Sequence, residues 1–199
     1  MNSGVFFYWF SWILIIWILF FMTKNNKRKI LAYWLLFIII CSNLHLTVGY
    51  YSISVSFLLI FTGSAIWIIA QQRFLYQLLC SFTVAIMYAA IHFWLHIAPV
   101  WLFLPITVII PLSCSLFIVL LVKKPLYRKA ICLFGICSGE LVYSITMTGY
   151  GFYRTIGEII FFDYIAGILL IFTVLAILHK GAAKLNSLIK HKQLRWQNE

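Results

Sequence analysis

Long apolar runs alternate with short polar stretches along the whole chain. A transmembrane helix needs about 20 apolar residues, because each residue advances it by about 1.5 Å and the hydrocarbon layer is about 30 Å thick. Seven runs come near this length, and they occupy residues 5–22, 30–48, 53–70, 74–95, 100–122, 130–148 and 159–178. The pattern predicts an all-α, polytopic membrane protein, with a single bundle of seven transmembrane helices over residues 1–178. The basic tail, residues 179–199, can lie as a helix on the membrane surface.

The composition excludes an ordinary soluble domain. Hydrophobic residues make up 64% of the 199 positions and charged residues 10%, and the mean hydropathy is +1.03. Soluble domains carry about 25% charged residues. The five cysteines all lie in apolar runs, in an odd number and without a Cys-x-x-Cys pair. We therefore expect neither disulfides nor a zinc site, and no cofactor.

The basic residues are distributed unevenly between the loops. The formal net charge is +11, and 14 of the 15 Lys and Arg residues follow the first, third and fifth runs or lie in the tail. Because Lys and Arg resist translocation, this bias predicts an N-terminus outside the cell and a cytoplasmic C-terminus. The cytoplasmic loops would then contact anionic headgroups of the cell membrane. Nucleic-acid binding is not expected, because no basic folded module remains outside the runs.

Glu140 is the most unusual residue in the apolar runs. The sequence has four carboxylate residues, and Glu140 lies ten residues into the sixth run. An ionised carboxylate near mid-bilayer costs several kcal/mol unless it is paired, hydrated or protonated, so we expect it to face the bundle interior. Tyr143 and Ser144 share its helical face and could donate a hydrogen bond. Glu140 is either a proton or substrate site or a protonated group that joins two helices.

A second charged group surrounds the hinge before the seventh run. Arg154 and Glu158 lie in the hinge, and Asp163 lies just inside the run. The simplest interpretation is an outer salt bridge that pins the hinge to the seventh helix. Alternatively, Asp163 lines a polar cavity that opens outward.

The histidines His45, His92 and His96 are all predicted at the outer ends of helices. His92 and His96 are one helical turn apart and could share a metal ion, with a third ligand from His45, Glu158 or Asp163. Two ligands do not make a site, and hydrogen bonds to headgroups or loops are the simpler interpretation.

Two glycines, Gly135 and Gly139, form a Gly-x-x-x-Gly motif in the sixth run. Such a motif allows two helices to approach closely. We expect a tight contact within the chain rather than a dimer.

Two short stretches resemble a known family. The residues are Gly-Glu-Leu-Val-Tyr at 139–143 and Thr-Gly-Tyr-Gly-Phe-Tyr-Arg at 148–154. With the chain length and the basic tail, they resemble the small YphA-like multi-pass membrane proteins of Bacillus and relatives. The resemblance implies a bacterial plasma membrane, but it supplies no activity and no site residues.

Three functional hypotheses follow. The first is a non-enzymatic accessory protein that binds a membrane partner, motivated by the lack of a complete catalytic constellation and by the Gly, Ser and Cys residues of the sixth run. The second is a small permease or proton-coupled carrier that uses Glu140, with Asp163 as an outer gate. The third is a membrane-embedded enzyme that uses the outer histidines.

Overall fold

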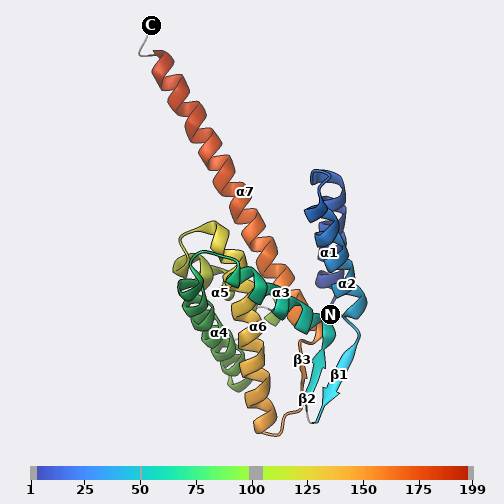
Figure 1. Cartoon of the computed structure of the whole chain (residues 1–199). Helices are drawn as coiled ribbons and strands as arrows, with labels where there is room; N and C mark the ends of the chain where they lie inside the picture. Colours follow the sequence, from blue (N-terminus) through green and yellow to red (C-terminus); the bar gives the residue numbers. More distant parts are fainter. Residues whose placement is uncertain (1–3, 50, 99–104, 197–199) are drawn as a thin grey trace.

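The computed structural model describes residues 4–49, 51–98 and 105–196. Figure 1 shows helices and short strands. The helices are α1 (Val5–Phe21), α2 (Asn26–Cys41), α3 (Val55–Ile69), α4 (Phe74–Ile97), α5 (Ile106–Leu121), α6 (Pro125–Gly149) and α7 (Ile159–Trp196). The strands are β1 (His45–Val48), β2 (Tyr51–Ser54) and β3 (Thr155–Ile156).

Helix α6 lies at the centre of the molecule. It packs most extensively against α4 and also contacts α3, while α5 packs against α7. The α1–α2 hairpin contacts α7 through α1 and α3 through α2. Buried aromatic rings join α3 to α7, since the fully buried rings of Phe57 and Phe161 meet edge to face at 5.4 Å between centroids.

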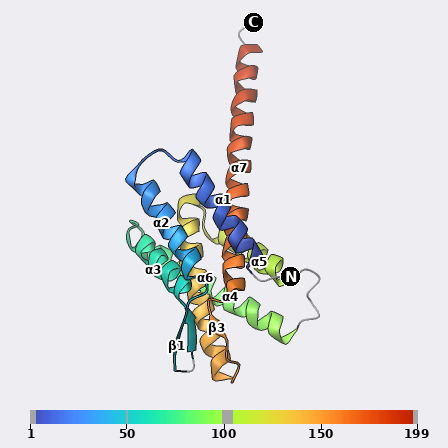
Figure 2. The ribbon, with the colours of Figure 1, turned by 90° about the vertical axis from the view of Figure 1, so that its right-hand side faces the viewer.

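The two ends of the molecule differ in character, as Figures 1 and 2 show from two sides. The turns α1–α2 and α5–α6 lie toward the end from which α7 projects. Both carry lysine, and arginine lies in the first turn of the helix that follows each of them. We call this the basic end. The β1–β2 hairpin and the loop after α6 lie at the opposite, hairpin end.

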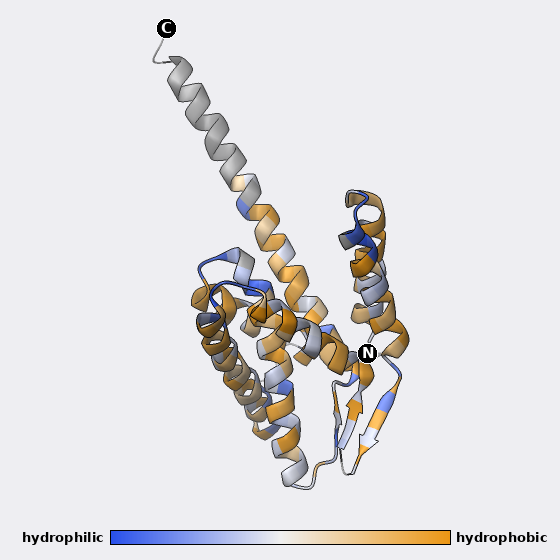
Figure 3. Cartoon of the chain, viewed as in Figure 1, coloured by the Kyte–Doolittle hydropathy of each residue, from blue (hydrophilic) through white to orange (hydrophobic). Residues whose placement is uncertain are grey.

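Much of the outer surface is apolar. Figure 3 shows hydrophobic residues along most of the helices. Large side chains such as Trp12, Phe20, Leu75 and Phe82 are exposed. Three helical segments are long and apolar enough to cross a membrane: Phe74–Ile97, Tyr127–Gly149 and Ile159–His179. The apolar helices α1, α3 and α5 are shorter.

The predicted boundaries of the second and third runs are wrong. Residues 45–48 and 51–54 form an antiparallel hairpin in which Val48 pairs with Tyr51, and β3 adds to β2 in parallel. β-branched and aromatic residues favour strands, and Gly49 adopts a φ of +63° in the turn. The end of the second predicted run and the start of the third therefore form strands instead of helix.

Three other boundaries also differ from the prediction. Helix α5 begins at Ile106, directly after Pro105, while residues 100–104 lie outside the described part of the chain. Helix α6 begins at Pro125, because proline is well suited to the first helical turn. Helix α7 continues without a break to Trp196, so the basic tail extends α7 instead of forming a separate helix after residue 178.

Candidate functional site

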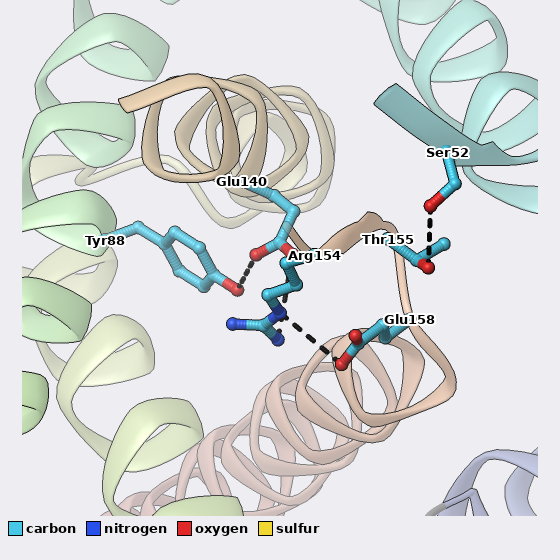
Figure 4. A network of polar contacts seen from close by, with 6 residues as sticks. All are labelled: Ser52, Tyr88, Glu140, Arg154, Thr155 and Glu158. Carbon is cyan, nitrogen blue, oxygen red and sulfur yellow. Dashed lines mark hydrogen bonds and ion pairs between the residues drawn. The ribbon is translucent and has the colours of Figure 1, made fainter. Parts of the chain in front are cut away.

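Glu140 lies on the inward face of α6, fully buried between helices. Figure 4 shows its two polar neighbours. The hydroxyl of Tyr88 on α4 donates a hydrogen bond of 2.7 Å to Oε2 of Glu140. Nη2 of Arg154 lies 4.0 Å from Oε1. A single carboxylate therefore contacts a neutral donor on one side and a cation on the other.

The close contact between α4 and α6 positions Tyr88 beside Glu140. A Cβ added to Gly135 would lie 2.9 Å from the carbonyl oxygen of Ser81, and one added to Gly139 would lie 2.8 Å from that of Ala85. Ser81 and Ala85 are themselves small and four residues apart, so small residues meet on both helices. The predicted close approach thus occurs within the chain, and α4 is the partner.

Arg154 reaches the site from the return loop, residues 150–158. The amide of Phe152 donates to the carbonyl of Met147, which turns the chain back at the end of α6. Gly151 and Gly157 adopt φ values of +86° and +72°, which side chains other than glycine rarely allow. The return loop is also tied to the hairpin, because Ser52 donates a 2.8 Å hydrogen bond to Thr155.

The guanidinium of Arg154 has three partners. Besides Glu140, its Nε lies 3.4 Å from Oε2 of Glu158, and its carbon lies 5.5 Å from the ring centroid of Tyr143. Burial acts to lower the pKa of Arg154, but the carboxylates of Glu140 and Glu158 outweigh it, so the pKa lies above its ordinary value. The guanidinium therefore stays charged in the site.

Several aromatic rings pack together beside Glu140 and Arg154. The ring of His92 lies 4.5 Å from Tyr88, 4.8 Å from Tyr143 and 5.7 Å from Tyr164, measured between centroids. His92 is buried, and its Nε2 has no hydrogen-bond partner among the described residues. The site thus combines one buried acid, one cation and several polarisable rings, an arrangement that can hold and release a proton or a cation.

The predicted donors to Glu140 take other roles. Tyr143 lies against Arg154, and the buried hydroxyl of Ser144 bonds to no side chain or backbone group in the described residues. Tyr88 supplies the hydrogen bond instead. The small residues Ser81 and Ala85, four positions apart, could have indicated that α4 packs against the glycine motif of α6. That packing is what brings Tyr88 next to Glu140.

Asp163 does not belong to this charged group. Arg154 pairs with Glu158, but Asp163 binds the N-terminus of α1 and is 4% exposed. Its predicted place in the outer salt bridge is therefore wrong, and its burial does not support a position in an open cavity. The reason is that α1 packs beside the start of α7, which brings backbone amides to the carboxylate.

The three histidines lie in different surroundings. His45 is exposed on β1, and His92 is inside the site. The ring of His96 lies beside that of Phe152, with 5.6 Å between the ring centroids. Within the described ranges, no group of three His, Cys, Asp or Glu residues is placed to hold a metal ion. The weak metal candidate made of His45, His92 and His96 is thus not assembled.

An apolar groove of about 120 Å³ lies apart from the site, between α1, α2, α6 and α7. Its lining includes Phe10 and Leu14 of α1, Trp34 of α2 and Leu169 of α7.

The apolar helices, the exposed apolar surface and the buried ion pair together define an integral membrane protein. The family model for the YphA-like integral membrane protein matches residues 3–198, and the chain belongs to this family. The resemblance noted in the sequence is thereby confirmed. No curated protein and no solved structure matches the chain.

Proposed function

We propose that this protein is a small, non-enzymatic, proton-coupled carrier in which Glu140 binds either a proton or a transported cation. The observation that supports it is the buried Glu140 carboxylate, which Arg154 connects to the surface. The Arg154 side chain is 23% exposed and that of its second partner Glu158 is 37% exposed. Ionisable groups inside a membrane commonly mark proton and substrate routes.

The mechanism follows from competition for one carboxylate. When Glu140 gains a proton, it loses its attraction for Arg154, and the return loop loses one of its ties to the bundle. When Glu140 loses the proton, it can pair again with Arg154 or with an incoming cation. Because a proton and a cation cannot both neutralise the same carboxylate, the expected coupling is an exchange.

Arg154 also indicates which class of cation would fit. Its planar guanidinium occupies the space between Glu140 and the ring of Tyr143. A delocalised organic cation could displace it, because aromatic faces bind such cations well. Guanidinium itself is the simplest probe.

The decisive experiment is transport into liposomes that contain the purified protein. With a pH gradient, the wild type should move radiolabelled guanidinium, and Glu140→Gln should not. Glu158→Gln removes the more exposed carboxylate of the same group, so transport should fall less than in Glu140→Gln. Equal transport by wild type and Glu140→Gln would refute the proposal.

Infrared difference spectroscopy tests the chemical premise separately. The carboxyl band, assigned by comparison with Glu140→Gln, should change as the pH of the lipid-embedded protein is varied over the range in which it stays folded. A band that stays constant over this range would mean that protons do not reach Glu140, and Glu140 would then serve packing alone.

An accessory role is the second candidate. The small-residue face of α6 that motivated it is occupied by α4, which weakens the case. The apolar groove supports it, because a partner's transmembrane helix could lie there. A photo-crosslinking residue at Leu169, which lines the groove, should capture such a helix, while one at the exposed Leu170 should capture lipid. Equal capture at both positions would remove this candidate.

We further propose seven membrane passes, with the N-terminus outside and a multi-pass location in the plasma membrane. The grouping of basic turns at one end supports this topology. Helices α1, α2, α3 and α5 have 15 to 17 residues, so each would cross together with its flanking residues. The five native cysteines are buried, which allows cysteine labelling. Thr47→Cys should react with a membrane-impermeant maleimide in intact cells, and Asn25→Cys should not.

A further inference from the structure

A groove of about 540 Å³ lies at the basic end, between the end of α5, the first turns of α6 and the middle of α7. Figure 1 shows these three segments close to the α5–α6 turn. Among the described residues, the groove is lined by the cations Lys123, Arg128 and Lys129 and by His179. We call it the basic groove. It is separate from the site around Glu140, which lies toward the hairpin end.

Apart from these residues, the described lining of the basic groove is apolar. Val119 of α5 faces Phe172 and Leu175 of α7. The segment Ile159–His179, to which both α7 residues belong, is one of the three segments suited to cross a membrane. The lysines lie where the helices leave the apolar zone. The basic groove thus places cations at headgroup depth and apolar side chains at acyl-chain depth.

Among the residues that the structure describes, no carboxylate lines the basic groove. Three of the chain's four acids are used elsewhere, because Glu140 and Glu158 bind Arg154 and Asp163 binds α1. The fourth, Glu199, lies outside the described residues. Three neighbouring cations without a protein carboxylate attract an external anion.

Two hydrogen bonds to backbone carbonyls hold the Arg128 side chain in one position. Its Nε donates a 2.7 Å hydrogen bond to the carbonyl of Val122, and its Nη2 donates a 3.4 Å bond to that of Lys123. These bonds anchor the side chain at the end of α5 and use two of its five N–H donors. A fixed guanidinium loses little freedom when it binds phosphate.

We propose that the basic groove binds one anionic phospholipid. The phosphate lies among Lys123, Arg128 and Lys129, and an acyl chain follows the apolar wall of α7. An amphiphile fits better than a free phosphate, because a free phosphate would leave the wall of Phe172 and Leu175 uncovered. The lipid would join α5, α6 and α7 at the cytoplasmic surface.

The test measures binding of dioleoylphosphatidylglycerol to the full-length protein in a non-ionic detergent, by native mass spectrometry. Dioleoylphosphatidylcholine serves as the lipid without net charge. The double variant Lys123→Gln/Lys129→Gln should bind phosphatidylglycerol about 30-fold more weakly than the wild type. Lys123→Arg/Lys129→Arg keeps the charge and should bind like the wild type, which separates lost charge from lost folding.

The matched control is Lys24→Gln/Lys29→Gln in the α1–α2 turn. It removes the same charge at the same end, but the space around these lysines is lined by polar residues alone. We expect it to leave binding unchanged. An equal loss in both double variants would overturn the proposal in favour of general attraction to the surface. Displacement of the lipid by millimolar glycerol 3-phosphate would overturn it in favour of a free phosphate.

Discussion

The carboxylate of Asp163 caps the N-terminus of α1 from 159 residues away. Its Oδ2 accepts a 2.8 Å hydrogen bond from the amide of Gly4, and its Oδ1 accepts a 2.7 Å bond from the amide of Phe7. The first amides of a helix have no partner within the helix, and inside a membrane no bulk water can replace one. A carboxylate also suits the positive end of the helix dipole. Asp163 thus attaches α1 to α7.

Asp163→Asn should weaken this attachment. The side-chain NH₂ group of asparagine cannot accept a hydrogen bond from a backbone amide. One of the two charge-assisted hydrogen bonds is therefore lost. We expect a loss of about 1.5 to 3 kcal/mol in the free energy of unfolding, measured by denaturant titration in detergent micelles. Glu158→Gln, at a more exposed carboxylate, should change it by less than about 1 kcal/mol. Equal effects of both substitutions would contradict a capping role for Asp163.

Gly139→Ala should force α4 and α6 apart. The new Cβ would meet the carbonyl oxygen of Ala85 at 2.8 Å, and backbone cannot move aside cheaply. We expect a loss of about 1 to 3 kcal/mol in the same unfolding assay. Gly149→Ala at the end of the same helix has open space around its Cβ and should be neutral or slightly stabilising. A neutral Gly139→Ala would show that the two helices are not in close contact in the membrane.

Tyr88→Phe should leave Glu140 with one polar neighbour fewer. The phenylalanine ring fills the same space, so the change isolates the 2.7 Å hydrogen bond. A bond to a charged group contributes about 1.5 to 3 kcal/mol, and this is the expected loss in unfolding free energy. Tyr76→Phe on the same helix removes a weak 3.5 Å contact to a carbonyl and is the control. If both variants unfold alike, Tyr88 does not stabilise the carboxylate.

Arg154→Gln should loosen the return loop, because its ion pairs with Glu140 and Glu158 are lost. Hydrogen–deuterium exchange of residues 150–158 should be faster than in the wild type. Arg154→Lys keeps the charge but not the planar guanidinium, so its exchange should be intermediate. Ser52→Ala removes the hydrogen bond between the β1–β2 hairpin and Thr155, and it tests whether this second attachment also restrains the loop. Unchanged exchange in Arg154→Gln would show that the ion pairs do not hold the loop.

Several features could be read from local sequence. The inward position of Glu140 followed from the cost of a carboxylate in lipid, and the structure buries it completely. The glycine motif indicated a close helix contact, which occurs with α4. The strands at residues 45–54 were missed, because an apolar run with β-branched residues can continue a helix or form a strand.

The sequence by itself determined that this is an integral membrane protein, because composition and apolar run length are local properties; the match to the family model places it in the YphA-like family. It also indicated which helix face carries the unusual acid. Only the tertiary structure decided which group each acid contacts. Tyr88 and Glu140 are 52 residues apart, and Gly4 and Asp163 are 159 apart. Helical periodicity states which side of a helix turns inward, but the path of the whole chain decides which helix lies opposite.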